Sequence, residues 1–316
     1  LPCDQLSYTD PNVNLTSENW YVIRVVDTAG FMSDFSQPLH VTVAEQKAFL
    51  RTWQNWLPGA DPRATLIARV YNSPEDGLAM LTRGIFYGGP REARTLMQPF
   101  LAFPGVRSRF EHITFSEAAS IIGSGYPPYE KFEAVSRYAL RKWNPSEIAR
   151  LTELIREPAK GSVFAGLSLY ALGGRVGEIP RDETAFYYRG AHFIVWLETI
   201  WEDPAFQWEN QKWISGRFAA LADVTAGSYV NFPYDRLPNY LEQYYHEHLY
   251  RLREIKKRYD PCNVFAFPQG ICGAPQLSEP PLRTTGYREE IPFRQPPEAP
   301  LSRKFWYVSN GNHGRR

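Results

Sequence analysis

The side chains best suited to acid–base chemistry in this sequence are its 19 tyrosines and 6 histidines. Two of the histidines, His246 and His248, flank Glu247 in an apolar stretch that is predicted as helix. The triplet suggests a metal site, but residues two apart on a helix point about 200° from each other, so these imidazoles cannot share one ion. We expect His248 to pack on the apolar stripe and His246 to lie on the surface.

The three cysteines, Cys3, Cys262 and Cys272, lack the spacing of a zinc site. Cys262 and Cys272 could close a short loop and leave Cys3 free or bonded to another chain. The sequence starts at Leu1 without a signal-peptide pattern, which indicates a processed protein or a piece of a longer one. A glycosylation sequon begins at Asn14, and we expect a secreted protein.

Several functional classes leave no signature here. The sequence has no G-x-G-x-x-G, no Walker loop and no G-x-S-x-G, so it shows no nucleotide cradle or serine nucleophile of its own. The net charge of +1 argues against a nucleic-acid partner, and no apolar run approaches the roughly 20 residues of a membrane helix. The aromatic content of 15% fits a large rigid core or, alternatively, an aromatic-lined pocket for a small molecule.

An ordered set of segments in the second half of the chain carries a family resemblance. Its parts are residues 172–180 (LGGRVGEIP), 183–191 (ETAFYYRGA), 228–235 (SYVNFPYD), 252–265 (LREIKKRYDPCNVF) and 267–271 (FPQGI). In order and spacing the set resembles the C-terminal region of the berberine bridge enzyme family, within the vanillyl-alcohol-oxidase type of flavoproteins. Residues 20–160 are more loosely similar to the substrate domain of that family.

The resemblance implies an FAD-linked oxidase of sugars, alkaloids, polyketides or aromatic alcohols. Members of the family hold FAD largely in an N-terminal domain, often through bonds to a His and a Cys. Neither those attachment motifs nor the glycine run that enters the substrate domain occurs in this sequence. We therefore expect FAD to be held mainly by a region or chain that is not present here, with this chain as the substrate-binding half.

Tyr229 matches the first tyrosine of the family's Tyr-x-Asn-Tyr strand, which lies beside the flavin. By this resemblance Tyr229 is the catalytic base for the substrate hydroxyl while hydride leaves for FAD, and Asn231 contacts the flavin or orders the strand. A phenol has a pKa of about 10, so a second phenol or a cation should lie close by. Phe232 departs from the second tyrosine of the pattern, and Tyr234, beyond a proline, is a candidate substitute.

Two other tyrosines are candidates for the substrate pocket. Tyr188 stands where many family members carry His, and Tyr170 lies on the minority face of a predicted strand. The alternative for each is core packing with a satisfied hydroxyl, the usual situation of a strand tyrosine. Arg189 is shared with the family and is expected to be structural.

The elements that must position these residues indicate an α+β fold, an antiparallel sheet covered by helices. Hydrophobic alternation predicts strands at 20–27, 65–71, 81–87, 163–171 and 192–201. The helical period predicts helices over 49–57 and 93–101, and Asn144-Pro145-Ser146-Glu147 is a capped helix start. One long helix is expected from Leu237 to Ile255, ended by Asp260-Pro261, and we expect it to dock on an FAD domain.

These expectations divide the chain into four segments. They are an extended segment (1–19), a substrate-binding domain (20–220), a berberine-bridge-type segment that completes the FAD domain (221–273) and a proline-rich extended tail (274–316). Two functions follow. The first is the substrate-binding subunit or fragment of an FAD-dependent oxidase, with an FAD-binding chain or domain and a small-molecule substrate as partners. The alternative, motivated by Phe232 and the Tyr187-Tyr188 pair, is a non-catalytic ligand-binding module that has lost the flavin domain.

Overall fold

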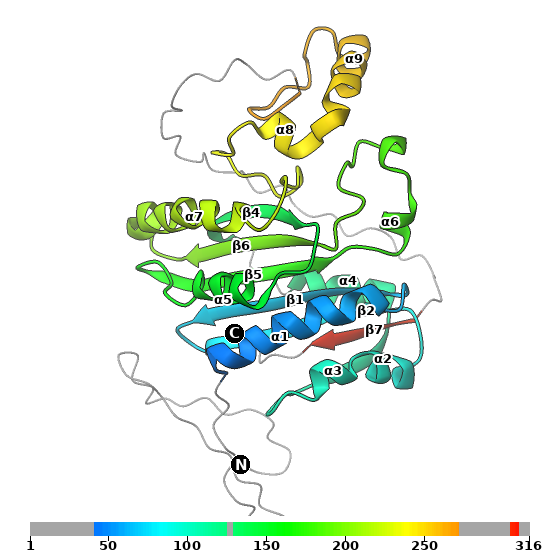
Figure 1. Ribbon diagram of the computed structural model, residues 1–316, viewed down its shortest axis with the longest axis vertical. Helices are drawn as coiled ribbons and strands as arrows, with labels where there is room; N and C mark the ends of the chain where they lie inside the picture. The colour runs from blue at the N-terminus through cyan, green and yellow to red at the C-terminus, as the bar shows by residue number, and fades with distance from the viewer. Residues whose placement is uncertain (1–40, 125–128, 272–303, 310–316) are drawn as a thin grey trace, which may run out of the picture. The chain divides into compact units, whose positions relative to one another are not determined.

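The computed structural model describes residues 41–124, 129–271 and 304–309 (Figure 1). The chain divides into two units, Leu1–Val41 and Thr42–Arg316, and every element below belongs to the second. The predicted strand at 20–27, the segment 1–19, the sequon at Asn14, Cys3 and Cys272 lie outside the described residues. No helix of the described residues is long and apolar enough to cross a membrane.

A 7-stranded antiparallel sheet is the framework, with strand order β3-β7-β2-β1-β5-β6-β4. Its strands are β1 Ala64–Ser73, β2 Gly77–Phe86, β3 Arg109–Thr114, β4 Lys131–Ala139, β5 Ser162–Ala171, β6 Phe193–Trp201 and β7 Lys304–Ser309. The prediction of an antiparallel α+β fold is confirmed, and the two strands predicted at 163–171 and 192–201 pair with each other. Strand β7 comes from the proline-rich tail.

Helices surround this sheet, and Figure 1 shows α1, α5 and α7 side by side on one of its faces. The helices are α1 Val43–Trp56, α2 Pro90–Leu96, α3 Gln98–Leu101, α4 Phe115–Ser124, α5 Pro145–Glu153, α6 Arg175–Glu178, α7 Gln207–Ala222, α8 Tyr240–Tyr245 and α9 Leu249–Tyr259. Short 3-10 turns occupy Leu57–Gly59, Arg181–Glu183, Pro204–Phe206 and His246–His248.

The main core lies between the sheet and these three helices, because each contributes an apolar stripe to it. Its largest fully buried side chain is Trp53 of α1, and Leu151 of α5 and Ile214 of α7 are also fully buried there. Alternate residues of the central strands, such as Leu167 and Leu197, face the same core. The opposite sheet face is therefore left to other side chains, which are described below.

Helix α5 begins as its sequence predicts. Asn144 accepts hydrogen bonds from the N–H groups of Ser146 and Glu147, and the Glu147 carboxylate accepts one from the Asn144 N–H. Arg141 donates to both carboxylate oxygens of Glu147, at 2.8 and 2.6 Å. Together the Arg141 guanidinium and the Asn144 N–H lower the pKa of Glu147 from 4.5 to about 2.

The stability that Glu147 contributes should depend on pH. Because its folded pKa is below the unfolded value of 4.5, the contribution is present above pH 4.5 and is lost as the pH falls toward about 2. At pH 7 we expect Glu147→Gln to lower Tm by only about 1–3 °C, since solvent screens the pair, and the difference should vanish at the acid end. Thermal melts of both proteins across this range test it, with Glu153→Gln on the same helix as the control.

Two helix predictions are wrong. The helix predicted at 93–101 is split into α2 and α3 because Pro99 lies in the first turn of α3, where it cannot continue the hydrogen-bond ladder of α2. The long helix predicted from Leu237 to Ile255 is broken into α8, a 3-10 turn and α9. At the break His246 has φ of +46°, and the Gln243 carbonyl accepts the Ser228 N–H and the Tyr188 hydroxyl, both at 2.9 Å, in place of a helical partner.

Helix α9 does end where the sequence predicts, at Tyr259, with Asp260 as its C-cap. Cys262 follows as a free and exposed thiol, and its possible partner Cys272 lies outside the described residues. Among the described residues no group of three or more His, Cys, Asp and Glu side chains could hold a metal ion.

Candidate active site

The sheet face opposite α1, α5 and α7, which we call the second face, carries its own aromatic cluster. Four of its members are buried: Tyr138 on β4, Ile194 on β6, and Tyr188 and Ala191 in the segment before β6. Half-buried side chains complete this aromatic cluster: Tyr170, Leu172, Phe186, Tyr187, Tyr229 and Phe232. The structure thus brings together three of the four predicted site residues, Tyr170, Tyr188 and Tyr229.

The strand register explains why these residues meet. Tyr170 lies opposite Ile194, and Ile194 lies opposite Tyr138, so the three form one row across β5, β6 and β4. The next row on the same face is Ser168, Trp196 and Ser136. Since side chains two residues apart along a strand share a face, the two rows form one continuous surface.

Tyr229 lies over these rows in an irregular segment, so the prediction that it is part of a strand is wrong. Its ring meets Tyr138 edge-on at 6.2 Å, Phe186 at 6.1 Å and Phe232 at 5.1 Å. The segment is held to the sheet by Ser136, whose hydroxyl accepts the Tyr229 N–H at 3.0 Å and donates to the Phe232 carbonyl at 2.9 Å. A buried serine therefore positions the loop in place of a strand ladder.

The Tyr229 hydroxyl accepts a hydrogen bond from its near neighbour in the sequence, Asn231. The Asn231 side-chain amide donates to it at 2.9 Å, and Asn231 itself is exposed. An amide N–H directed at a phenol oxygen stabilises negative charge that develops there. Both residues that the sequence predicts at the flavin therefore lie together at the half-buried edge of the aromatic cluster.

Tyr188 occupies the interior of the aromatic cluster. Its ring stacks on Tyr138 with centroids 4.2 Å apart and an interplanar angle of 16°. Its hydroxyl donates to the Gln243 carbonyl, and burial raises the pKa of Tyr188 to about 12. Burial also raises the pKa of Tyr138. These two phenols are therefore poor bases, and the Tyr188 hydroxyl ties the cluster to α8.

The other two candidate tyrosines, Tyr170 and Tyr234, lie on opposite faces of the sheet. Tyr170 lies 5.3 Å from Phe232, ring to ring, so it faces the same surface as Tyr229. Tyr234 is buried in the main core, where its ring lies 5.9 Å from Phe218. Tyr234 therefore does not replace the hydroxyl that the family pattern has at Phe232, and Phe232 instead packs edge-on against Trp196 at 4.3 Å.

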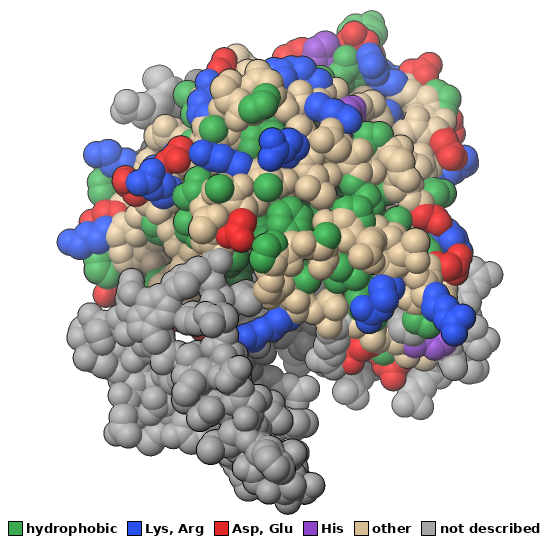
Figure 2. Space-filling model, turned by 60° about the horizontal axis from the view of Figure 1, so that its bottom comes forward, with side chains coloured by type: hydrophobic (Ala, Val, Ile, Leu, Met, Phe, Trp, Pro, Cys, Tyr) green, Lys and Arg blue, Asp and Glu red, His purple; other side chains and the backbone are tan. Residues whose placement is uncertain are grey.

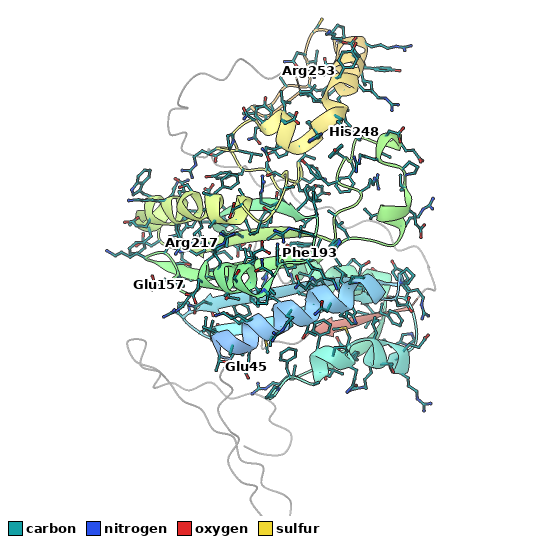
Figure 3. The ribbon with its side chains drawn as sticks, in the orientation of Figure 1. Glu45, Glu157, Phe193, Arg217, His248 and Arg253 are labelled. Carbon is teal, nitrogen blue, oxygen red and sulfur yellow. The ribbon has the colours of Figure 1, made fainter. Side chains whose placement is uncertain are left out.

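The segment before β6 is anchored from the α8–α9 side as well. Tyr187 stacks on His246 at 4.5 Å and 11°, and His248 Nδ1 lies 3.3 Å from the Ala185 carbonyl oxygen. In Figure 3 His248 lies between α8–α9 and the loop that follows α6. Arg189 donates to the Val176 carbonyl of α6 and to the Thr184 hydroxyl in that loop, which agrees with the structural role expected for it.

A buried cation, Arg137, supports the cluster from β4. It donates to the Gln243 side-chain oxygen at 2.7 Å and to Thr225 at 3.1 Å, and burial lowers its pKa to about 10. Arg137 therefore stays charged at neutral pH and holds α8 and the segment after α7 against the sheet.

The molecular face in Figure 2 shows basic and acidic side chains interspersed, without a large field of one sign.

Gly227 is the tightest point of the site. It has φ of +51°, and a Cβ built on it would lie 2.0 Å from the Tyr188 ring and hydroxyl. We expect Gly227→Ala to lower the free energy of unfolding by about 1–3 kcal/mol, because it adds both backbone strain and a clash. Chemical denaturation measures this. Gly190→Ala in the neighbouring segment is the control, since nothing lies within 4 Å of its added Cβ, and equal losses in the two variants would contradict the prediction.

The chain is similar in sequence to a known family and to FAD-linked oxidoreductases. The family model described as "Berberine and berberine like" matches residues 228–272, the segment that carries Tyr229 and Asn231. The FAD-linked oxidoreductase YgaK of Bacillus subtilis is 32% identical over 235 residues, which are 73% of this chain and 49% of YgaK. Residues 228–272 form a berberine-bridge-type segment. A second relative from Bacillus subtilis, the FAD-linked oxidoreductase YvdP, is 30% identical over 70% of this chain.

Solved structures of berberine bridge enzyme-like proteins share the fold. The crystal structure of aclacinomycin oxidoreductase superposes with a TM-score of 0.63 at 22% identity, over 74% of this chain and 53% of that one. A variant of berberine bridge enzyme superposes with a TM-score of 0.64 at 16% identity, over 74% and 54%. The chain thus spans about half the length of the relatives and structures that it matches.

Sequence reasoning missed four residues of this site: Ser136 and Tyr138 on β4, Trp196 on β6, and Gly227. A signal existed for the first two, because Phe132, Ala134, Ser136 and Tyr138 alternate along β4. The alternation is hard to see in the sequence because residues 134–139 are all buried, on both faces of the strand. A strand covered on both faces loses the alternation of polar and apolar residues.

Proposed function

We propose that this chain supplies the substrate-binding face of an FAD-dependent oxidase and that Tyr229 removes the proton of the substrate hydroxyl. The observation that carries the proposal is the placement of the Tyr229 hydroxyl, which receives the Asn231 amide at the half-buried edge of the aromatic cluster. The match of residues 228–272 to the family model and the FAD-linked relatives support it.

The residues present fit the ring system of a flavin. The half-buried rings of Tyr229 and Phe232, which meet edge-to-face, offer apolar contacts, and the exposed amide of Asn231 offers a polar contact beside them. When bound, FAD would accept the hydride that leaves the substrate carbon. On this chain, Tyr229 takes the hydroxyl proton, Asn231 stabilises charge on the phenol oxygen, and Tyr170 and Trp196 shield the site from water.

The FAD-holding region is proposed to dock on the C-terminal segment. Helix α9 and the residues after it expose large apolar side chains, which are Tyr250 (77% exposed), Tyr259 (73%), Val264 (76%), Phe265 (79%) and Phe267 (57%). A contiguous stretch of exposed apolar side chains is typical of an interaction surface. The proposal keeps the docking role expected for the predicted long helix, with α9 and residues 260–267 in its place.

The double variant Val264→Ser/Phe265→Ser should weaken binding of the flavin-holding region by about tenfold or more, because it removes two exposed anchors. The readout is the ratio of flavin to protein absorbance after gel filtration of the assembled oxidase. Trp208→Ser, which removes an exposed ring from α7, is the matched control. Equal flavin retention in all three proteins would place the docking surface elsewhere.

The experiment that tests the proposed function is an absorbance spectrum and a peroxide assay on the protein purified with any chain that accompanies it. The oxidase proposal expects flavin absorbance and substrate-dependent peroxide release from the assembly. A colourless preparation that binds small molecules but releases no peroxide would favour the non-catalytic ligand-binding module instead.

A further inference from the structure

A charged pair lies on the second face beyond the aromatic cluster. Arg69 of β1 donates from Nε to the Ser168 hydroxyl of β5 at 2.7 Å, and its Nη2 lies 3.0 Å from Glu198 Oε1 of β6. The Phe164 ring lies 5.2 Å from the guanidinium carbon. The two charged side chains keep 16% and 11% of their surface exposed, so the pair is sheltered without being sealed.

This pair shares a surface with Tyr229. Ser168 lies in the row of Trp196 and Ser136, and Glu198 lies one row further along β6. Trp196 contacts Phe232, and Phe232 contacts Tyr229, so aromatic side chains connect the two ends. Ile194, in the row of Tyr138, and Glu198 lie four positions apart on β6, which is about 13 Å of strand.

The pair has unused hydrogen-bonding capacity. Glu198 Oε1 makes a charge contact with Arg69 but has no hydrogen-bond partner among the described residues. A guanidinium carries more N–H donors than the two contacts of Arg69 use. Nearby Glu130 has a raised pKa, because of burial first and the Glu198 charge second, so added negative charge is disfavoured here.

The chemistry of the pair selects among ligand groups. A hydroxyl both donates and accepts, so it can donate to Glu198 and accept from Arg69 at once. An ammonium only donates and would be repelled by Arg69, whereas a carboxylate only accepts and would be repelled by Glu198. The arrangement therefore favours neutral groups rich in hydroxyls over charged ones.

We propose that Arg69 and Glu198 form a specificity-determining pair that binds hydroxyl groups of the substrate at the end of the second face remote from Tyr229. A substrate that reaches both ends is at least two rings long and is neutral and hydroxyl-rich at the Arg69–Glu198 end. This inference rests on the proposed function, because it takes Tyr229 as the reacting end of the same surface.

Three probes that differ mainly in charge test the pair: a nitrophenyl glucoside, the matching glucuronide and the matching amino-sugar glycoside. Each is titrated calorimetrically into the protein in its native assembly. We expect the neutral glucoside to bind about tenfold more tightly than either charged probe. Equal affinities, tightest binding of a charged probe or no binding of the glucoside would each overturn the proposal.

The variant that tests the pair replaces both charges together, Arg69→Met/Glu198→Leu, so that no lone charge stays buried. It should lose about tenfold in glucoside affinity and all preference among the probes, with an unchanged near-ultraviolet circular dichroism spectrum. The control Glu153→Leu/Arg156→Met removes an exposed ion pair and should retain both the glucoside affinity and the preference among the probes. Unchanged glucoside affinity in the Arg69→Met/Glu198→Leu variant overturns the inference. Peroxide release is measured separately, so that a failure of the oxidase proposal can be distinguished from a failure of this inference.

Discussion

Tyr229→Phe is expected to lower kcat of the assembled oxidase by about 10²–10⁴-fold, the usual contribution of a positioned general base. The substitution removes only the hydroxyl that accepts the Asn231 amide, and the ring contacts with Phe186 and Phe232 remain. Substrate affinity and flavin content should therefore change little. Stopped-flow reduction of the flavin separates the proton and hydride step from binding.

The control for this variant is Tyr87→Phe, which removes a hydroxyl from an exposed ring directly after β2. Its kcat should equal that of the wild type. Asn231→Ala should lose less activity than Tyr229→Phe, since it removes a stabilising N–H but leaves the base. If Tyr229→Phe retains full activity, Tyr229 is not the base. Tyr188 would not be the base either, because it is buried and its hydroxyl is bonded to the Gln243 carbonyl.

Ser136→Ala is expected to lower kcat by up to about 100-fold although Ser136 is fully buried and lies behind the reacting hydroxyl. The Ser136 hydroxyl is the link between β4 and the Tyr229 loop, through the Tyr229 N–H and the Phe232 carbonyl. Without it two backbone groups lose their partner, which should also cost about 1–3 kcal/mol of unfolding free energy.

Two measurements identify Ser136 as a positioning residue. Ser136→Thr, which keeps the hydroxyl, should recover much of the activity, whereas a role limited to folding would leave kcat per folded molecule unchanged in Ser136→Ala. Ser215→Ala on α7 removes a hydroxyl that bonds only within its own helix, and it should alter neither property. Equal kcat values for Ser136→Ala and the wild type would show that the loop is held by its aromatic packing alone.

Local signals were sufficient for much of the fold. The start of α5 follows from a cap, a proline and a carboxylate that act within a single turn, so its sequence suffices to predict it. The pairing of β5 with β6 follows from two clear runs of strand-forming residues. The aromatic cluster could be anticipated in part, because Tyr170 lies on the minority face of β5 and Tyr188 and Tyr229 belong to the family pattern.

The remaining features depend on contacts between distant parts of the chain. The break between α8 and α9 arises because the Gln243 carbonyl accepts partners from two other segments, Ser228 and Tyr188, and no local periodicity records that. The same holds for the loop of Tyr229, which Ser136 holds to β4. The charged pair on the second face combines β1 and β6, which are separated by β5 in the sheet, and only the register places them together.

The position of β7 in the sheet affects how the protein folds and how it resists aggregation. Strand β3 meets the rest of the sheet only through β7, which also borders β2. During synthesis, β3 must therefore wait for residues 304–309 before it gains a partner, a connection of high contact order that slows folding. Loss of β7 from the sheet would leave both β2 and β3 with unpaired edges, which are templates for aggregation. Strand β7 therefore completes a sheet whose other described strands are all synthesised well before it.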